Sequence, residues 1–336
     1  MIWVAFRRHR TNLAIAAGLA ITLALWMAWV VHGFQTTPFV RDRSAGFPVL
    51  PFRDYYRGPW LFQLPHQVDA LNFLLLAFPC ALGGLLGVPL VSAELEDRTN
   101  RLAWSQSISR TRWLLTKWWV VGLPILVISV LVALVTQWWQ HQVGTVGSVS
   151  IFGPVNFGGS GRMQPQVFSV TGVAPVAYTL FAFSLGTAMG ALLRRVSWSI
   201  VATIVVYAIA LAIMVTTVRS NLAPRSFLPY SSSASGVSLP LTHSDGEPPW
   251  ILGFDYRFVP GSHHPSNSSA TELGRNCEVQ LADFFTCKTR NSIESGQIFQ
   301  PPSNYWTLQW RESLIYLAAS ALLLALCLWL VRRWRA

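Results

Sequence analysis

Residues 94–117 read ELEDRTNRLAWSQSISRTRWLLTK and separate two long apolar runs in a chain of 336 residues. On a helix, four charged residues of this stretch fall at i, i+3, i+4 and i+7 and share one face: Glu94, Asp97, Arg98 and Arg101. Glu94 and Asp97 each precede an arginine by four positions, which is the favourable order for a helical ion pair. The stretch therefore predicts a short charged helix between two membrane spans, which is either a docking surface or an ordinary solvated loop helix.

The composition of the chain excludes an ordinary soluble domain. Hydrophobic residues make up 52% of it, and the mean hydropathy is +0.40. Both values are typical of a protein that crosses the membrane several times. Many of the 16 tryptophans lie near the ends of apolar runs, where an indole ring prefers the lipid headgroup region.

The apolar runs predict an all-α polytopic membrane protein with six transmembrane helices in a single transmembrane domain. The expected spans are residues 13–31, 68–91, 113–139, 172–193, 196–218 and 314–331. Residues 92–112 link the second span to the third, and residues 219–312 form a long outer segment before the last span. Residues 1–12 mix apolar and basic side chains, which predicts a short interfacial helix leading into the first span.

The net charge of +11 is divided unevenly between the two expected sides of the membrane, and this indicates the topology. The expected cytoplasmic segments hold 13 basic and 3 acidic residues: 1–12, 92–117, 194–195 and 332–336. The expected outer segments hold 12 basic and 11 acidic residues: 32–69, 138–171 and 219–313. The positive-inside rule then places both termini in the cytoplasm, and a nucleic-acid partner is not expected.

Two pairs of glycines four residues apart lie within predicted spans. Gly83 and Gly87 are in the second span, and Gly186 and Gly190 are in the fourth. Small residues at this spacing let helices approach closely in lipid. The pattern predicts close helix contacts, either within one chain or between two chains.

Two stretches carry a recognisable pattern. The first, E-L-E-x-x-T-x-R-L-A-W-x-Q-S-x-S-R-x-R-W-L-x-x-K, is carried by Glu94, Glu96, Thr99, Arg101, Leu102, Trp104, Gln106, Ser109, Arg110, Trp113 and Lys117. The second, Q-P-x-x-x-[FY]-W-x-x-Q-x-x-E, is carried by Gln300, Pro301, Tyr305, Trp306, Gln309 and Glu312. Together they resemble the coupling-helix region and the last span of ABC-2-type (type V exporter-like) transporter permeases of the small actinobacterial kind. The chain departs from the family pattern at Arg98, where glycine is common.

The resemblance implies a transport subunit without catalytic activity of its own. In such a transporter two permease subunits, the same or similar, pair in the plasma membrane of a bacterium, and each engages a cytoplasmic ABC ATPase. Residues 1–12 would then be an elbow helix. The residues expected to couple to the ATPase are Glu94, Glu96, Asp97, Arg98, Arg101, Arg110, Arg194 and Arg195. For Arg194 and Arg195, the positive-inside rule alone is an alternative explanation.

No cofactor and no metal ion is expected in this chain. The phosphate-binding sequence G-x-x-x-x-G-K-[ST] does not occur, so ATP and Mg²⁺ are expected on the partner ATPase. His263 and His264 are adjacent but have no cysteine or acidic residue at ligand spacing.

The outer side of the chain offers two further candidates. Cys277 and Cys287 lie in a non-cytoplasmic segment at a spacing suited to a disulfide. Gln309, Glu312 and Tyr316 share a face at the outer end of the last span, and a carboxylate there requires a partner. Glu312 either lines the exit of a transport path or pairs, at headgroup level, with Arg311 or an arginine of an outer loop.

Few ionisable residues lie at span centres, which favours a hydrophobic or amphipathic cargo such as a drug, an antibiotic or a lipid. Two other functions remain open. One is a polytopic enzyme acting on lipid, although H-E-x-x-H and G-x-S-x-G are both missing and the nearest acid/base pair is His66 with Asp69. The other is a membrane sensor that binds a ligand through residues 219–312.

Overall fold

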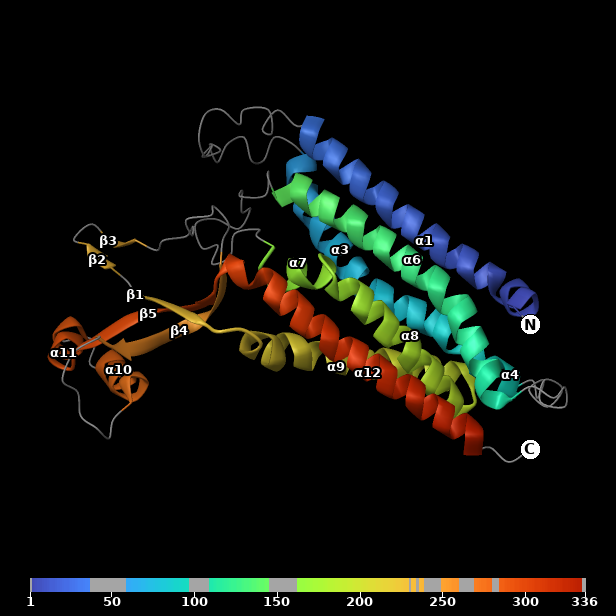
Figure 1. The fold of residues 1–336 in the computed structure, drawn as a ribbon. Coiled ribbons are helices and arrows are strands. Elements are labelled where there is room, and N and C mark those ends of the chain that lie inside the picture. The colour runs from blue at the N-terminus through green and yellow to red at the C-terminus, as the bar shows by residue number, and fades with distance from the viewer. Residues whose placement is uncertain are drawn as a thin grey trace.

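The computed structural model describes residues 2–36, 59–96, 109–144, 162–229, 231–233, 236–238, 249–259, 269–279 and 284–333. Within these ranges, six helices are long and apolar enough to cross a membrane. They form a bundle, with both ends of the chain at one end of it and a small domain containing strands at the other (Figure 1). The predicted all-α polytopic architecture with six spans is confirmed.

Three spans form one side of the bundle. They are α1 (Ile2–Thr36), α3 (Pro59–Leu82) with its continuation through the π-helical turn η2 (Gly83–Gly87) into α4 (Pro89–Glu96), and α6 (Arg110–Gly144). Buried apolar side chains such as Met27, Leu71 and Ile125 hold them together. The interfacial helix expected at residues 1–12 is not separate, because no proline or glycine interrupts α1 before Gly18.

The fourth span, α8 (Ala174–Leu193), is the central helix. In its most apolar window 72% of the residues are buried, against 17% for the fifth span. It packs along the sixth span, α12 (Tyr305–Arg333), and also contacts η2 and α9 (Val196–Ile213). Side chains on α8 are therefore shielded from lipid and can hold polar groups.

The glycines of the second and fourth spans pack against each other within this chain. A Cβ atom on Gly186 would lie 2.3 Å from the carbonyl oxygen of Gly83. A Cβ atom on Gly190 would lie 2.7 Å from the carbonyl oxygen of Val88. Both small-residue pairs thus serve the crossing of α8 with the π-helical turn η2.

The fifth span extends beyond α9 through the π-helical turn η4 (Met214–Val218) and the 3-10 turn η5 (Arg219–Asn221). Arg219 therefore belongs to the end of a span and not to the outer segment, as the predicted boundary would place it. A short helix, α7 (Pro165–Val170), precedes α8 and begins with proline, whose fixed φ suits the first helical position.

Outside the bundle, the segment between the fifth and sixth spans folds into a small domain. Its sheet is antiparallel in the order β1 (Ser226–Pro229), β5 (Ile293–Gln300), β4 (Trp250–Phe258). A hairpin of β2 (Ser231–Ser233) with β3 (Gly236–Ser238), and the helices α10 (Ala270–Val279) and α11 (Phe284–Arg290), complete it. The turn η6 (Pro302–Asn304) connects β5 to α12.

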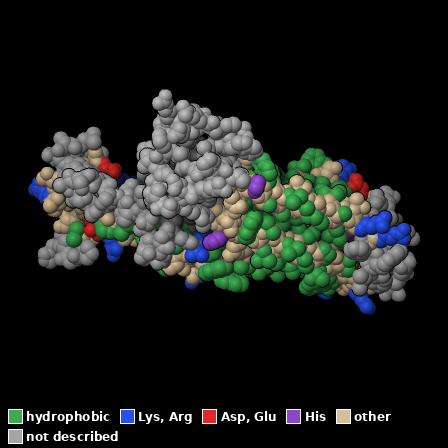
Figure 2. Space-filling view, turned by 90° about the horizontal axis from the view of Figure 1, so that it is seen from above, with side chains coloured by type: hydrophobic (Ala, Val, Ile, Leu, Met, Phe, Trp, Pro, Cys, Tyr) green, Lys and Arg blue, Asp and Glu red, His purple; other side chains and the backbone are tan. Residues whose placement is uncertain are grey.

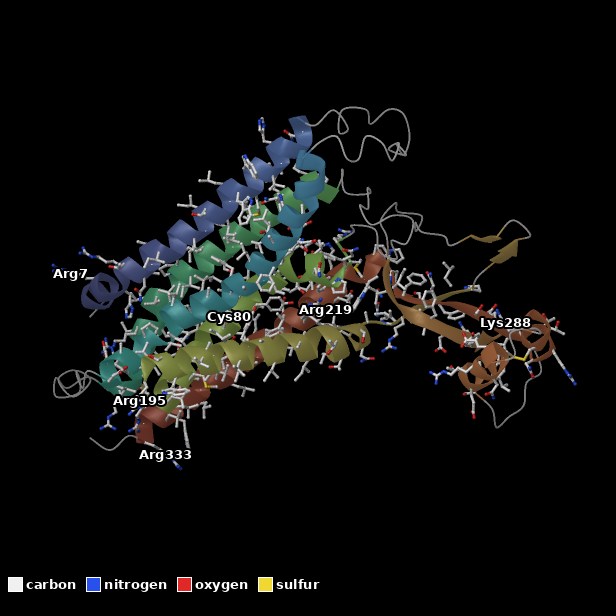
Figure 3. The ribbon with its side chains drawn as sticks, turned by 180° about the vertical axis from the view of Figure 1, so that it is seen from behind. Arg7, Cys80, Arg195, Arg219, Lys288 and Arg333 are labelled. Carbon is white, nitrogen blue, oxygen red and sulfur yellow. A yellow bond between two sulfur atoms is a disulfide. The ribbon has the colours of Figure 1, made fainter. Side chains whose placement is uncertain are left out.

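The surface of the bundle fits a lipid environment. Figure 2 shows hydrophobic side chains along its sides and lysine and arginine side chains gathered at the end away from the outer domain. Arg7, Arg195 and Arg333 lie at that end (Figure 3). This separation agrees with the arginine distribution from which a cytoplasmic location of the termini is predicted.

Candidate functional site

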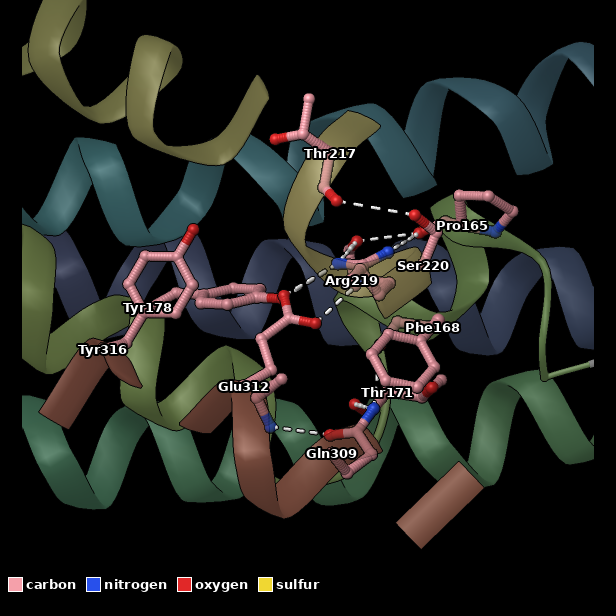
Figure 4. A network of polar contacts seen from close by, with 12 residues as sticks. Pro165, Phe168, Thr171, Tyr178, Thr217, Arg219, Ser220, Gln309, Glu312 and Tyr316 are labelled. Atoms are coloured by element: carbon pink, nitrogen blue, oxygen red, sulfur yellow. Dashed lines mark hydrogen bonds and ion pairs between the residues drawn. The ribbon is translucent and has the colours of Figure 1, made fainter. Parts of the chain in front are cut away.

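Arg219 is a charged side chain with no exposed surface, at the outer end of the bundle. The turn η5 directs its guanidinium group toward α12 (Figure 4). Its Nε donates to Oε2 of Glu312 and its Nη2 donates to Oε1, each over 2.8 Å. Two parallel bonds between a guanidinium and a carboxylate are the strongest common form of ion pair.

The same guanidinium group also binds the short helix α7. Its Nη1 donates to the carbonyl oxygen of Pro165 over 3.1 Å, and its Nη2 donates to Oγ of Ser169 over 2.8 Å. The ring of Phe168 lies 4.5 Å from the guanidinium carbon, within the range of a cation–π contact. Arg219 thus fastens α7 to the end of the fifth span.

Tyr178 of α8 completes the surroundings of the carboxylate. Its hydroxyl group donates to Oε1 of Glu312 and accepts a bond from Nη2 of Arg219 over 3.2 Å. Its ring makes an edge contact with the ring of Tyr316, with 4.7 Å between the centroids. Four separate segments, α7, α8, η5 and α12, therefore meet at one ion pair.

Gln309 secures the connection between α7 and α8. Its Oε1 accepts from the backbone nitrogens of Val173 and Ala174, over 3.1 and 2.9 Å, at the beginning of α8. Its Nε2 donates to the carbonyl oxygens of Phe168 and Thr171. The side chain thereby satisfies backbone groups that the ends of two helices leave without partners.

Gly172 allows this close approach. Its φ angle is +72°, a left-handed conformation that favours glycine. A Cβ atom there would lie 2.8 Å from the hydroxyl oxygen of Tyr305 and 2.9 Å from the amide of Gln309.

The three residues predicted at the outer end of the last span do share one face, and all three are buried: Gln309, Glu312 and Tyr316. Glu312 pairs with an arginine, as one of its two expected roles requires, and this arginine is one that the prediction assigned to the outer segment. Its partner is Arg219 at the end of the fifth span, whereas the guanidinium of Arg311 donates to the carbonyl oxygen of Leu222. The pair is also enclosed by protein, because α7 covers it from the outer side.

Sequence reasoning missed Arg219, Tyr178 and Ser169 as members of this network. A usable signal existed for Arg219, which follows directly on an apolar run and so lies at the depth where Glu312 begins the last span. No such signal marks Tyr178 or Ser169, because tyrosine and serine are common in spans. Only the packing of α7 and α8 brings them to the ion pair.

The arrangement is suited to holding helices together. Separating one charge from the other would leave it uncompensated in a medium of low dielectric constant. Among the described residues, no three His, Cys, Asp or Glu side chains lie together as a metal site would require. The side chain of His66 and the pair His263 and His264 lie outside the described residues.

At the other end of the bundle, Glu94 forms an ion pair with Lys117 of α6. Both side chains are buried, and Nζ of Lys117 lies 4.1 Å from the centroid of the Trp113 ring. Glu94 therefore faces α6, because α4 packs its C-terminal half against that helix.

Glu96 links α4 to the turn between the fourth and fifth spans. Its Oε2 accepts from the backbone nitrogen of Val196, the first residue of α9, over 3.2 Å. Arg194 ends α8 in a left-handed conformation with φ of 56°, and its nitrogen donates to the carbonyl oxygen of Gly190. Arg195 is exposed beside it. The structure thus brings Glu96, Arg194 and Arg195 to one surface.

Of the other predicted coupling residues, the structure describes Arg110 alone. Arg110 begins α6, next to Ser109, whose backbone oxygen accepts from the nitrogen of Trp113 over 3.0 Å. Asp97, Arg98 and Arg101 lie outside the described residues.

In the outer domain, Cys277 of α10 and Cys287 of α11 are joined by a disulfide. The side-chain nitrogen of Asn291 donates to the carbonyl oxygen of Cys287 over 2.9 Å. Lys288 lies beside this bridge and donates to Oγ of Ser295 over 2.6 Å. Burial lowers the pKa of Lys288 from its usual value, and the neighbouring Glu294 opposes that shift.

The described residues include six helices long and apolar enough to span a membrane, and a buried ion pair joins two of them at one end. The chain is therefore a multi-pass helical membrane protein. The family profile described as "ABC-2 membrane transporter related" matches residues 51–219, and the chain belongs to that family of ABC transporter permeases. Such a permease is a transport subunit that is not itself catalytic, and it implies ABC ATPase partners. No curated protein and no solved structure matches the chain. The family match runs from the second span to Arg219, so Glu312 and the outer domain lie beyond it.

Proposed function

We propose that the chain is the permease subunit of an ABC exporter in a bacterial plasma membrane, moving a hydrophobic or amphipathic compound outward. Separate ATPase subunits would bind ATP and Mg²⁺ and supply the energy. A second permease subunit, identical or similar, would complete the path through the membrane. The cargo class is that of drugs, antibiotics and lipids.

The contact between Glu96 and Val196 carries this proposal, together with the family match. It joins the end of α4, after which the coupling segment follows in the sequence, to the N-terminus of α9. The ion pair between Glu94 and Lys117 joins the same helix to α6. A force applied to the coupling segment by an ATPase would therefore act on α6 and α9 together.

The fifth span offers a route from that surface to the outer network. Its helical residues run from Val196 to Asn221, 26 residues, or roughly 39 Å at the usual helical rise. Glu96 contacts its first residue, and Arg219 lies near its last. A movement of this helix would pull Arg219 away from Glu312 and free α7, opening the outer end for release.

The cargo class follows from the charges in the spans. Among the described residues, the ionisable groups Glu94, Lys117, Arg219 and Glu312 lie near the span ends and are paired with each other. No charge is thus left over near the middle of the bundle to hold a hydrophilic ion. An apolar or amphipathic compound is the better match.

The test is copurification of the tagged chain with its ATPase in mild detergent. The variant carries Arg101→Glu and Arg195→Glu, and the matched control carries Arg290→Glu, a charge reversal at an exposed site of the outer domain. We expect the wild type and the control to recover the ATPase and the double variant to lose it while remaining folded. ATP-dependent export of a fluorescent lipid or drug from proteoliposomes should be lost in the same variant. Equal ATPase recovery with all three chains would refute the docking surface.

A further inference from the structure

The outer domain contains a hollow of about 520 Å³ between β4, β5 and α10. A volume of this size is typical of sites for small organic molecules. Its described lining residues all belong to the outer domain. Its wall combines aromatic and charged side chains, and each group has a defined position.

The aromatic part of the wall comes from β4. Phe254 is 61% exposed, so its ring is open to solvent at the hollow. Tyr256 lies two residues further on the same strand, so both side chains point to one face of the sheet. The face of such a ring attracts cations.

Tyr256 is fixed in place by α10. A Cβ atom on Gly274 would lie 2.1 Å from the Tyr256 ring, so only glycine admits the ring at this position of the helix. The hydroxyl group of Tyr256 donates to Oε1 of Glu278. Burial and the adjacent Glu278 raise the pKa of Tyr256 above its usual value, so the hydroxyl stays a donor to Glu278 at neutral pH.

Two carboxylates and one guanidinium complete the wall. Oδ1 of Asp255 accepts from Oγ1 of Thr271 and from the nitrogen of Tyr256, each over 2.8 Å. Oδ2 of Asp255 and Oε2 of Glu278 have no partner among the described residues, so each can accept a further bond. Among the described lining residues Arg275 is the basic group, and Lys288 of α11 lies next to the wall through its bond to Oγ of Ser295.

From this wall we infer a binding site for an organic cation with an aromatic or apolar body. Asp255 and Glu278 would hold the charge, and Phe254 would cover the apolar part. Tyr256 would orient Glu278 and contribute its ring.

The site is placed where occupation would act on the membrane part of the chain. Strand β5 ends at Gln300, which is buried, and its Nε2 donates to the carbonyl oxygens of Ser220 and Ala223 over 3.3 and 2.9 Å. Asn304 donates to the carbonyl oxygen of Pro224. The strand that lines the hollow is thus fastened to the turn that carries Arg219.

The experiment is a titration of the full-length chain in lipid nanodiscs, followed by ligand-observed NMR. The probes are benzyltrimethylammonium and, as an anion of similar size, benzenesulfonate. We expect the cation to bind and the anion to bind at least tenfold more weakly. Replacing Phe254 by alanine should weaken cation binding about threefold. The isosteric pair Asp255→Asn and Glu278→Gln should weaken it about fivefold.

Binding of the cation to nanodisc lipid alone is measured with empty discs and subtracted. Arg290→Glu is the control variant and should bind like the wild type. Limited proteolysis of the outer domain at the wild-type rate shows that it is folded in each variant. The inference is overturned if the anion binds as tightly as the cation. Unchanged cation affinity in both wall variants, or no binding to the wild type, overturns it equally.

Discussion

The carboxylate of Glu312 and the guanidinium of Arg219 form a bidentate ion pair without exposed surface, although 93 residues separate them in the chain. The pair lies where the fifth and sixth spans leave the membrane, and both residues also bind Tyr178 of the fourth span. A charge pair enclosed in this way cannot loosen gradually, because each partner would be left in a medium of low dielectric constant. The ends of the fifth and sixth spans are therefore joined by one enclosed contact.

Removing one partner of this pair should cost more than removing both. Glu312→Gln or Arg219→Met is expected to lower the free energy of unfolding by about 3–5 kcal/mol, because the other charge stays buried and unpaired. The double variant Glu312→Gln with Arg219→Met should lose clearly less than the sum. Unfolding in mixed micelles provides the double-mutant cycle. Arg290→Ala, at an exposed position of the outer domain, is the control and should change stability by no more than about 0.5 kcal/mol. Additive losses would contradict the ion pair.

The crossing of α8 with η2 should not tolerate a methyl group. Gly186→Ala places a Cβ atom 2.3 Å from the Gly83 carbonyl oxygen, which the backbone can relieve only by moving a helix. We expect a loss of about 1–3 kcal/mol or more in unfolding free energy. Gly18→Ala is the matched control, since its Cβ atom has no neighbour within 4 Å. That change should stabilise α1 by about 0.5–1 kcal/mol. A neutral Gly186→Ala variant would show that the helices cross less tightly.

The ion pair between Glu94 and Lys117 should stabilise the contact between α4 and α6. Lys117→Met leaves the Glu94 carboxylate buried between α4 and α6, and we expect a loss of about 3 kcal/mol in unfolding free energy. The charge-swapped chain with Glu94→Lys and Lys117→Glu should recover part of that loss. If the swapped chain loses as much unfolding free energy as the single variants Glu94→Lys and Lys117→Glu lose together, the contact does not stabilise the fold.

The outer disulfide should be detectable by thiol labelling. Of the four cysteines, Cys80 and Cys327 are free, so the denatured chain should take up two labels before reduction and four after it. Cys277→Ser with Cys287→Ser is expected to destabilise the outer domain by about 2–3 kcal/mol, since the bridge closes a loop of ten residues. Limited proteolysis should then cleave residues 269–292 faster while the membrane helices stay protected. Four labels without reduction would exclude the bridge.

Tyr256 should ionise later than an exposed tyrosine. Its pKa is raised in the folded chain, so the folded protein keeps this proton at pH values where an unfolded chain has lost it. The stability that its bond to Glu278 provides is complete below the ordinary tyrosine pKa of about 10 and is lost as the pH rises through the raised value. Ultraviolet difference spectra of the wild type and Tyr256→Phe during alkaline titration measure this. A difference signal that titrates near pH 10 would contradict the hydrogen bond to Glu278.

Much of the membrane part was predictable, because hydrophobic length is a local property. The six spans, their order and the face shared by Gln309, Glu312 and Tyr316 follow from spacing alone. Helix bounds were less predictable, since α1 begins among basic residues and the fifth span continues through the polar turn η5, both of which apolar run length excludes. The strands of the outer domain were not predicted, although β4 alternates apolar and polar side chains from Phe254 to Phe258, a pattern that is typical of a strand.

The sequence by itself determined that this chain crosses the membrane six times, belongs with ABC-2 permeases and concentrates its positive charge at one end. These properties depend on which residues stand near each other along the chain. Only the tertiary structure decided that Arg219 meets Glu312, that Glu94 faces Lys117 and that Glu96 contacts Val196. A charged side chain in a low-dielectric bundle must find a partner, but the identity of that partner depends on how α7, α8 and the last span pack. Arg219 and Glu312 are 93 positions apart, so their pairing depends on helix packing, which no local sequence pattern predicts.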